Sequence, residues 1–113
     1  MNWCGYTNEN GQPETRGTEG GTIIVDEEHD FGARITLERL GEGPPCAITC
    51  GIYGWMVHTR FFAEAAAAER DYAAMKARLA EIVEQIPLKS DPEVEKKMRD
   101  VADAMSAFVD QFP

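Results

Sequence analysis

The sequence predicts an α+β domain: a three-stranded antiparallel meander followed by a two-helix antiparallel hairpin, which together form a βββαα two-layer sandwich. Three observations predict it. Apolar and polar residues alternate with a period of two before residue 41, as in a strand with one wet face. Residues 46–62 are rich in β-branched and aromatic side chains. From residue 64 onward the apolar residues recur at helical spacing. A length of 113 residues with 43% hydrophobic content fits one globular domain.

Residues 1–21 are predicted to form a flexible N-terminal tail, because they carry five glycines and no apolar period. The glycine-rich stretch 17–21 lacks the lysine and the helix start of a phosphate cradle, and we interpret it as a linker. Trp3 and Tyr6 are unusual in such a tail. They either dock against the body or a second chain, or share the disorder of the tail. The single domain is therefore expected to span residues 22–113.

The first two strands are predicted at 22–29 and 33–40. In the second of them Ile35 and Leu37 alternate with polar residues, so one face of the strand is expected to be buried. Gly32 lies between the two segments and can adopt the positive φ that a short hairpin turn needs. The two segments are therefore predicted to pair as a β-hairpin.

A third strand is predicted at 46–62, and its length is its main peculiarity. At roughly 3.3 Å per residue it is about twice as long as the strand it would pair with. It is therefore expected either to bend or bulge at Gly51 or Gly54, or to extend beyond its own sheet with residues 55–62. In the second case the backbone groups of this overhang would need a partner elsewhere.

Two helices are predicted at 64–86 and 92–112. Pro87 ends the first, and Asp91 and Pro92 supply the N-cap and the first helical position of the second. Because only a few residues separate them, the helices are expected to run antiparallel as a hairpin.

Two groups of residues raise the question of a metal site. The acidic run 26–30 contains four carboxylates and His29, but we interpret it as the solvated tip of the hairpin. Cys46, Cys50 and His58 are ligand types that zinc prefers. On a strand, however, two cysteines four positions apart lie about 13 Å from each other, which no single metal ion spans. We therefore expect buried thiols, no metal and no other cofactor.

Composition and motifs exclude several classes of function. Twenty acidic residues against eleven basic ones give a formal charge of −9, which disfavours binding to nucleic acid. No uncharged stretch reaches the roughly 20 apolar residues of a membrane span, and the first residues lack the pattern of a signal peptide, so the expected compartment is the cytoplasm. Because no catalytic or nucleotide-binding motif is present, the sequence favours a non-catalytic protein over an enzyme.

The third predicted strand is apolar on both faces, whereas two helices can cover only one. The candidate interface or ligand residues on and near it are Tyr53, Trp55, Val57, His58 and Phe61. The sequence therefore predicts an interaction or adaptor module that forms a homodimer through its third strand and can engage a protein with a basic surface. The alternative is a small-molecule-binding protein or enzyme. Its pocket would lie between the sheet and the helices, lined by Tyr53, Trp55, His58 and Met75.

Overall fold

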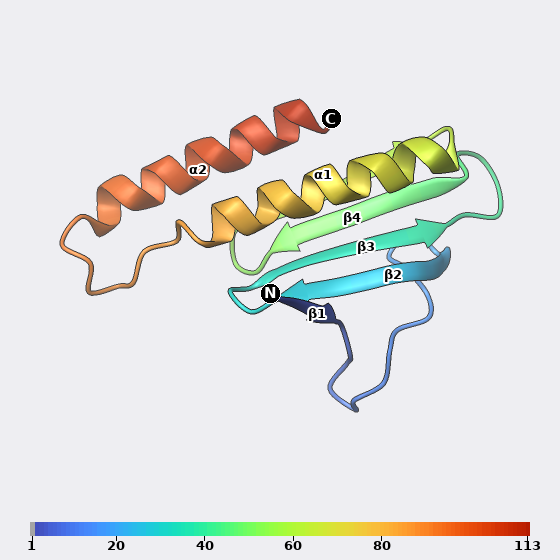
Figure 1. The fold of residues 1–113 in the computed structure, drawn as a ribbon, viewed down its shortest axis with the longest axis horizontal. Coiled ribbons are helices and arrows are strands. Elements are labelled where there is room, and N and C mark those ends of the chain that lie inside the picture. The colour runs from blue at the N-terminus through green and yellow to red at the C-terminus, as the bar shows by residue number, and fades with distance from the viewer. Residues whose placement is uncertain (1) are drawn as a thin grey trace.

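The computed structural model describes residues 2–113 and contains a five-stranded antiparallel sheet with two helices (Figure 1). The strands are β1 (Trp3–Gly5), β2 (Thr22–His29), β3 (Ala33–Arg39), β4 (Cys46–Ile52) and β5 (Met56–Phe62), and the helices are α1 (Ala65–Val83) and α2 (Val94–Gln111). The strands lie side by side in chain order. No helix in the described part of the chain is long and apolar enough to cross a bilayer.

The α+β class is confirmed, and so is the hairpin of β2 and β3. These strands pair from His29 and Ala33 at the turn to Thr22 and Arg39 at the far end. Gly32 has a φ of 101°, which places it in the left-handed region that glycine adopts at no steric cost. The number of strands is different: the sequence predicts three, and the structure has five.

The predicted single strand over 46–62 is wrong, because the chain reverses at residues 53–55. β4 and β5 pair with each other from Ile52 and Met56 to Cys46 and Phe62. Gly54 makes the reversal possible, since its φ of 81° is one that other residues adopt only with strain. Residues 55–62 therefore do not overhang the sheet, and the backbone of β5 pairs along one side with β4 of the same chain.

The fifth strand, β1, lies in the segment where the sequence predicts a tail. Trp3 pairs with His29 at the edge of the sheet, and the edge of one ring meets the face of the other with 5.0 Å between their centroids. Tyr6 lies 3.5 Å from the guanidinium carbon of Arg34, which sits over its ring. Both aromatic residues thus dock against the body of the domain.

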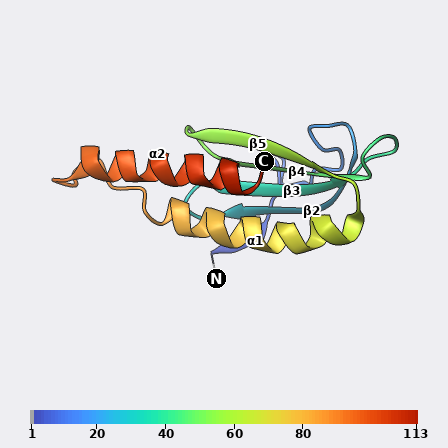
Figure 2. The ribbon, with the colours of Figure 1, turned by 90° about the horizontal axis from the view of Figure 1, so that it is seen from above.

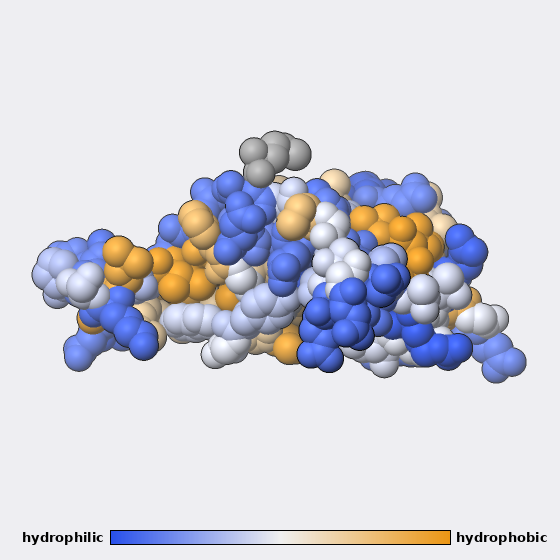
Figure 3. Space-filling view, turned by 90° about the horizontal axis from the view of Figure 1, so that it is seen from below, coloured by the Kyte–Doolittle hydropathy of each residue, from blue (hydrophilic) through white to orange (hydrophobic). Residues whose placement is uncertain are grey.

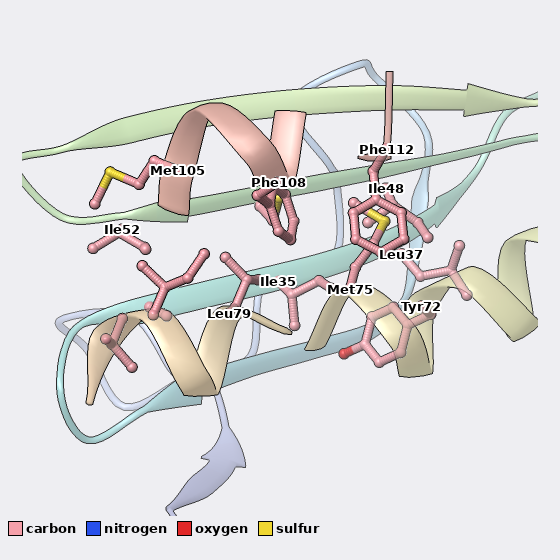
Figure 4. Packing of buried hydrophobic residues seen from close by; sticks show 14 of the residues in the cluster. Ile35, Leu37, Ile48, Ile52, Tyr72, Met75, Leu79, Met105, Phe108 and Phe112 are labelled. Carbon is pink, nitrogen blue, oxygen red and sulfur yellow. The ribbon is translucent and has the colours of Figure 1, made fainter. Parts of the chain in front are cut away.

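The hydrophobic core lies between one face of the sheet and the two antiparallel helices (Figure 2). Helix α1 runs along and packs against β3 and β4, while the second half of α2 packs beside β5 (Figures 1 and 2). The packing is drawn in Figure 4; its labelled residues are Ile35, Leu37, Ile48, Ile52, Tyr72, Met75, Leu79, Met105, Phe108 and Phe112. Each fully buried aliphatic or aromatic side chain contributes about 1.5–3 kcal/mol relative to an exposed one.

Polar contacts also fix the helices to the strands. The carboxylate of Glu27 accepts hydrogen bonds from the Tyr72 hydroxyl at 2.8 Å and from the Lys76 ammonium at 2.7 Å, which ties β2 to α1. Partial burial disfavours the charged carboxylate, but these hydrogen bonds outweigh burial and hold the pKa of Glu27 below its ordinary value. On β5, His58 Nε2 donates a hydrogen bond of 2.5 Å to the carbonyl oxygen of Phe112, the residue that follows α2.

The reversal at Gly54 can be tested by substitution. Gly54→Ala is expected to destabilise the protein by about 1–2 kcal/mol, because alanine resists a positive φ. A Cβ at this position would meet no atom within 4 Å, so the loss would come from backbone conformation and not from a clash. Gly41→Ala is the control, since Gly41 also has open space around it and no positive φ. Urea unfolding that shows equal stability for the two variants would contradict the hairpin.

The Glu27 contact predicts a pH dependence. Because the pKa of Glu27 is lowered by folding, its contribution is fully present above the unfolded value near 4.5 and is lost as the pH falls through the folded-state pKa. Glu27→Gln should therefore lose stability at neutral pH and show a weaker further loss in acid than the native chain. The measurement is urea unfolding from neutral pH to well below 4.5. Glu42→Gln, in the exposed β3–β4 loop, should retain the native pH profile.

Candidate functional site

The candidate site lies on the face of the sheet that the helices leave uncovered, which we call the open face. The side chains that β3, β4 and β5 present there are Arg34, Thr36, Glu38, Ala47, Thr49, Val57, Thr59 and Phe61. Residues 15–21, which precede β2, cross part of this face (Figure 2). The open face is therefore partly covered by the chain itself.

Glu38 anchors this covering segment. Its side chain is fully buried, and its carboxylate accepts hydrogen bonds from the backbone N–H of Gly21 at 2.9 Å and of Glu19 at 3.4 Å. A buried carboxylate needs such donors, since an unpaired one would be strongly destabilising. A Cβ on Gly17 would lie 2.2 Å from Glu38 Oε2, so a larger residue there would require the carboxylate to move. Residues 17–21, interpreted from the sequence as a linker, thus bind the carboxylate of Glu38 in the same chain.

A second polar cluster holds the β2–β3 side of the open face. Arg34 donates two hydrogen bonds to Asp26, at 3.0 and 2.8 Å, and Thr36 donates a third to the same carboxylate at 3.0 Å. The hydrogen bonds to Asp26 raise the pKa of Arg34 above its ordinary value. The charge of Arg34 is therefore balanced by Asp26 within the protein.

Between residues 16–18 and the turn at residues 53–55 the open face is hollowed into a groove of about 560 Å³, which we call the open-face groove. Gly51 lies in its floor, paired with Arg34 on one side and Val57 on the other. With no side chain at this position, the floor is lowered to the level of the backbone. A Cβ on Gly51 would also lie 2.8 Å from the carbonyl oxygen of Met56, so the position favours glycine.

The residues that the sequence singles out lie on both faces of the sheet. Tyr53, Trp55 and Val57 line the open-face groove, and Phe61 lies exposed on the same face of the sheet. His58 points to the opposite face, where it meets α2, and Met75 is fully buried in the core. The groove therefore lies on the far side of the sheet from the helices, and not between the two layers.

Neither group of potential metal ligands forms a cluster. Cys50 pairs with His58 across β4 and β5, but Cys46 pairs with Phe62 at the end of the strands. Among residues 2–113 no group of three histidine, cysteine, aspartate or glutamate side chains could hold a metal ion. Burial raises the pKa of Cys50 to about 12, so its thiol stays protonated at neutral pH.

The acidic run 26–30 is divided between the two faces of the sheet. Asp26 binds Arg34 on the open face, whereas Glu27 binds α1 on the helical face. Glu28 accepts a hydrogen bond of 2.6 Å from the Tyr53 hydroxyl. Burial and this hydrogen bond raise the pKa of Tyr53. These three carboxylates thus serve as structural acceptors.

The open-face groove has the chemistry of a binding site. It offers hydroxyl groups, aromatic rings and a guanidinium group, and no histidine or carboxylate that could act as a general base is among its described lining residues. Comparisons of the chain with family models, with curated proteins and with solved structures find no match. The geometry of the chain must therefore carry the functional argument.

The role of Glu38 can be tested directly. Glu38→Ala is expected to cost about 2–3 kcal/mol, because it removes charge-assisted hydrogen bonds to the segment that precedes β2. The amide protons of Glu19 and Gly21 should then exchange faster with solvent. Glu42→Ala removes an exposed carboxylate a few residues away and should change neither quantity. Urea unfolding and NMR hydrogen exchange measure both, and unchanged exchange at Gly21 in Glu38→Ala would contradict the anchoring role.

Proposed function

We propose that the protein is a non-catalytic interaction module that forms a homodimer by pairing β5 with β5 of a second copy. The observation that carries the proposal is the composition of this edge. On a chain of formal charge −9, the open-face side chains of β5 are Val57, Thr59 and Phe61, none of which is charged. Val57 is 81% exposed and Phe61 50% exposed.

The two edges of the sheet differ in a way that supports pairing at β5. Isolated proteins usually protect a sheet edge by shortening the strand, charging it or covering it. The β1 edge has three residues, and the surface seen from that side is mostly hydrophilic (Figure 3). The β5 edge has seven residues and no further strand beside it, and Figure 2 shows α2 beside β5 without crossing over it.

An antiparallel pair of β5 strands has a register that suits both faces. With the two-fold axis at Thr59, Val57 of each copy lies opposite the partner's Phe61, so the apolar side chains meet on the open face. On the helical face, His58 lies opposite the partner's Arg60. The charge of Arg60 is balanced there, because Asp71 of the same chain binds it at 2.5 Å.

The net charge of the chain opposes the proposed dimer. Two copies of charge −9 repel each other, but at physiological salt this repulsion is screened beyond about 8 Å. The uncharged open face of β5 keeps carboxylates away from the contact. The acidic exterior that remains suits a protein partner with a basic surface, and the cytoplasm remains the expected compartment.

The dimer is tested by sedimentation equilibrium at micromolar concentration. The native chain should give twice the monomer mass, and the double variant Val57→Glu with Phe61→Glu should give the monomer mass, because it places carboxylates opposite each other at the contact. Both side chains are exposed in the single chain, so circular dichroism and thermal unfolding of the separated chain should show an intact fold.

Leu88→Glu is the matched control for this experiment. It also exchanges an exposed apolar side chain for a carboxylate, but Leu88 is 77% exposed in the segment between α1 and α2, away from β5. This variant should remain dimeric. A native chain of monomer mass, or a dimer that the β5 variant leaves intact, would refute the proposal.

A further inference from the structure

The open-face groove has the dimensions of a small-molecule site. Its volume of about 560 Å³ lies within the range of known ligand pockets, roughly 300–1,000 Å³. Residues 16–18 form one wall and residues 53–55 the other, with Gly51 in the floor. Each wall is fixed independently, because Glu38 holds the segment beside the first and the β4–β5 pairing holds the second.

One side of the groove is apolar and aromatic. Trp55, Val57 and Tyr53 line it, and Ile23 lies among the lining residues contributed by β2. The Tyr53 hydroxyl is bound to Glu28 at 2.6 Å, which orients the ring and leaves it 55% exposed. Such a surface favours a flat, apolar molecule, because aromatic rings give a large contact area at little cost in side-chain entropy.

The other side of the groove carries a positive charge that has no carboxylate partner. Arg16 lines the groove and forms no ion pair with any carboxylate of residues 2–113, whereas Arg34 is neutralised by Asp26. A hydrogen bond of 3.2 Å from Arg16 to the carbonyl oxygen of Gly20 positions its guanidinium. The group has five N–H donors, so donors remain for an anion.

Hydroxyl groups continue the polar side across the floor. Thr18 and Thr49 are joined by a hydrogen bond of 3.1 Å between their Oγ1 atoms, and Thr49 and Thr59 by another of 3.1 Å. Either partner can donate in each pair, so the chain of hydroxyls can reorient toward a ligand oxygen. A carboxylate beside Arg16 would thus find a second class of donor next to the guanidinium.

We propose that the open-face groove binds a small organic carboxylate with a flat apolar body, with the carboxylate at Arg16 and Thr18 and the body against Trp55 and Val57. The charged wall of this site lies on residues 16–18 and not on β5, although Val57 belongs both to the apolar wall and to the proposed β5 contact. The pairing of one charged group with one apolar wall specifies an amphipathic anion over a neutral apolar molecule or a simple inorganic anion.

The test compares two probes of the same shape, the anion 2-naphthoate and the neutral 2-naphthamide. Both are titrated into the native protein by calorimetry and followed by NMR. The carboxylate should bind at least tenfold more tightly than the amide, because a hydrogen bond to a charged group is worth more than one to a neutral group. Its chemical-shift changes should centre on residues 16–18, Gly51 and Trp55.

Arg16→Gln is the decisive variant, and Arg39→Gln is its matched control. Both side chains are exposed arginines without an ion-pair partner in the described chain, but Arg39 lies outside the groove. Arg16→Gln should weaken naphthoate about tenfold and leave naphthamide unchanged. Arg39→Gln should leave both affinities at their native values.

Three results would overturn the proposal. They are no binding of naphthoate at millimolar concentration, equal affinity for the acid and the amide, and shift changes that lie outside the groove. Equal weakening of naphthoate by Arg16→Gln and Arg39→Gln would also overturn it, because the effect would then come from overall charge. Circular dichroism of both variants confirms that folding is unchanged.

Discussion

The open face of the sheet is organised by the burial of one carboxylate. The two helices cover only the other face. Glu38 is fully buried on the open face, and its carboxylate accepts hydrogen bonds from the backbone N–H groups of Glu19 and Gly21. Without those donors the charge would carry a penalty of several kcal/mol, so folding of β3 and placement of this segment depend on each other. The position of Arg16 and Thr18 beside the groove follows from the same contact. One buried carboxylate thus shapes the charged wall of the open-face groove.

The elements that the sequence predicts correctly are those whose signals are local. Gly32 between two alternating segments specifies the β2–β3 hairpin, and a period of 3.6 specifies the two helices. The helix ends differ from the prediction. Helix α1 stops at Val83, before Pro87. Helix α2 begins at Val94, with Glu93 and not Asp91 at its N-cap position. The sequence does not predict the β4–β5 reversal, because its turn contains three residues. Ile52 and Met56 therefore face the helices in the same phase as in an unbroken strand. The apolar pattern is identical for one long strand and for a tight hairpin, and only Gly54 marks the difference.

The open-face groove was predictable in part. Tyr53, Trp55 and Val57 stand out in the sequence because they are large and, in a single strand, would share the face away from the helices. In the structure all three line the groove, but Trp55 also packs against the core. Arg16 does not stand out, since its role depends on a bond between Glu38 and Gly21, residues 17 positions apart in a segment without any period. β1 is missed for a related reason, because three residues are too few to show an alternation.

The inequality of the two sheet edges limits how far assembly through the sheet can go. A sheet with two long, uncharged edges could add copies at both ends and grow into a fibre. Here β1 offers three residues, while β5 offers seven. In the proposed β5 dimer, each copy would present only its short β1 edge to the outside, so strand addition would stop at a closed pair. The short first strand would then prevent polymerisation through backbone geometry alone, with no need for a particular side chain.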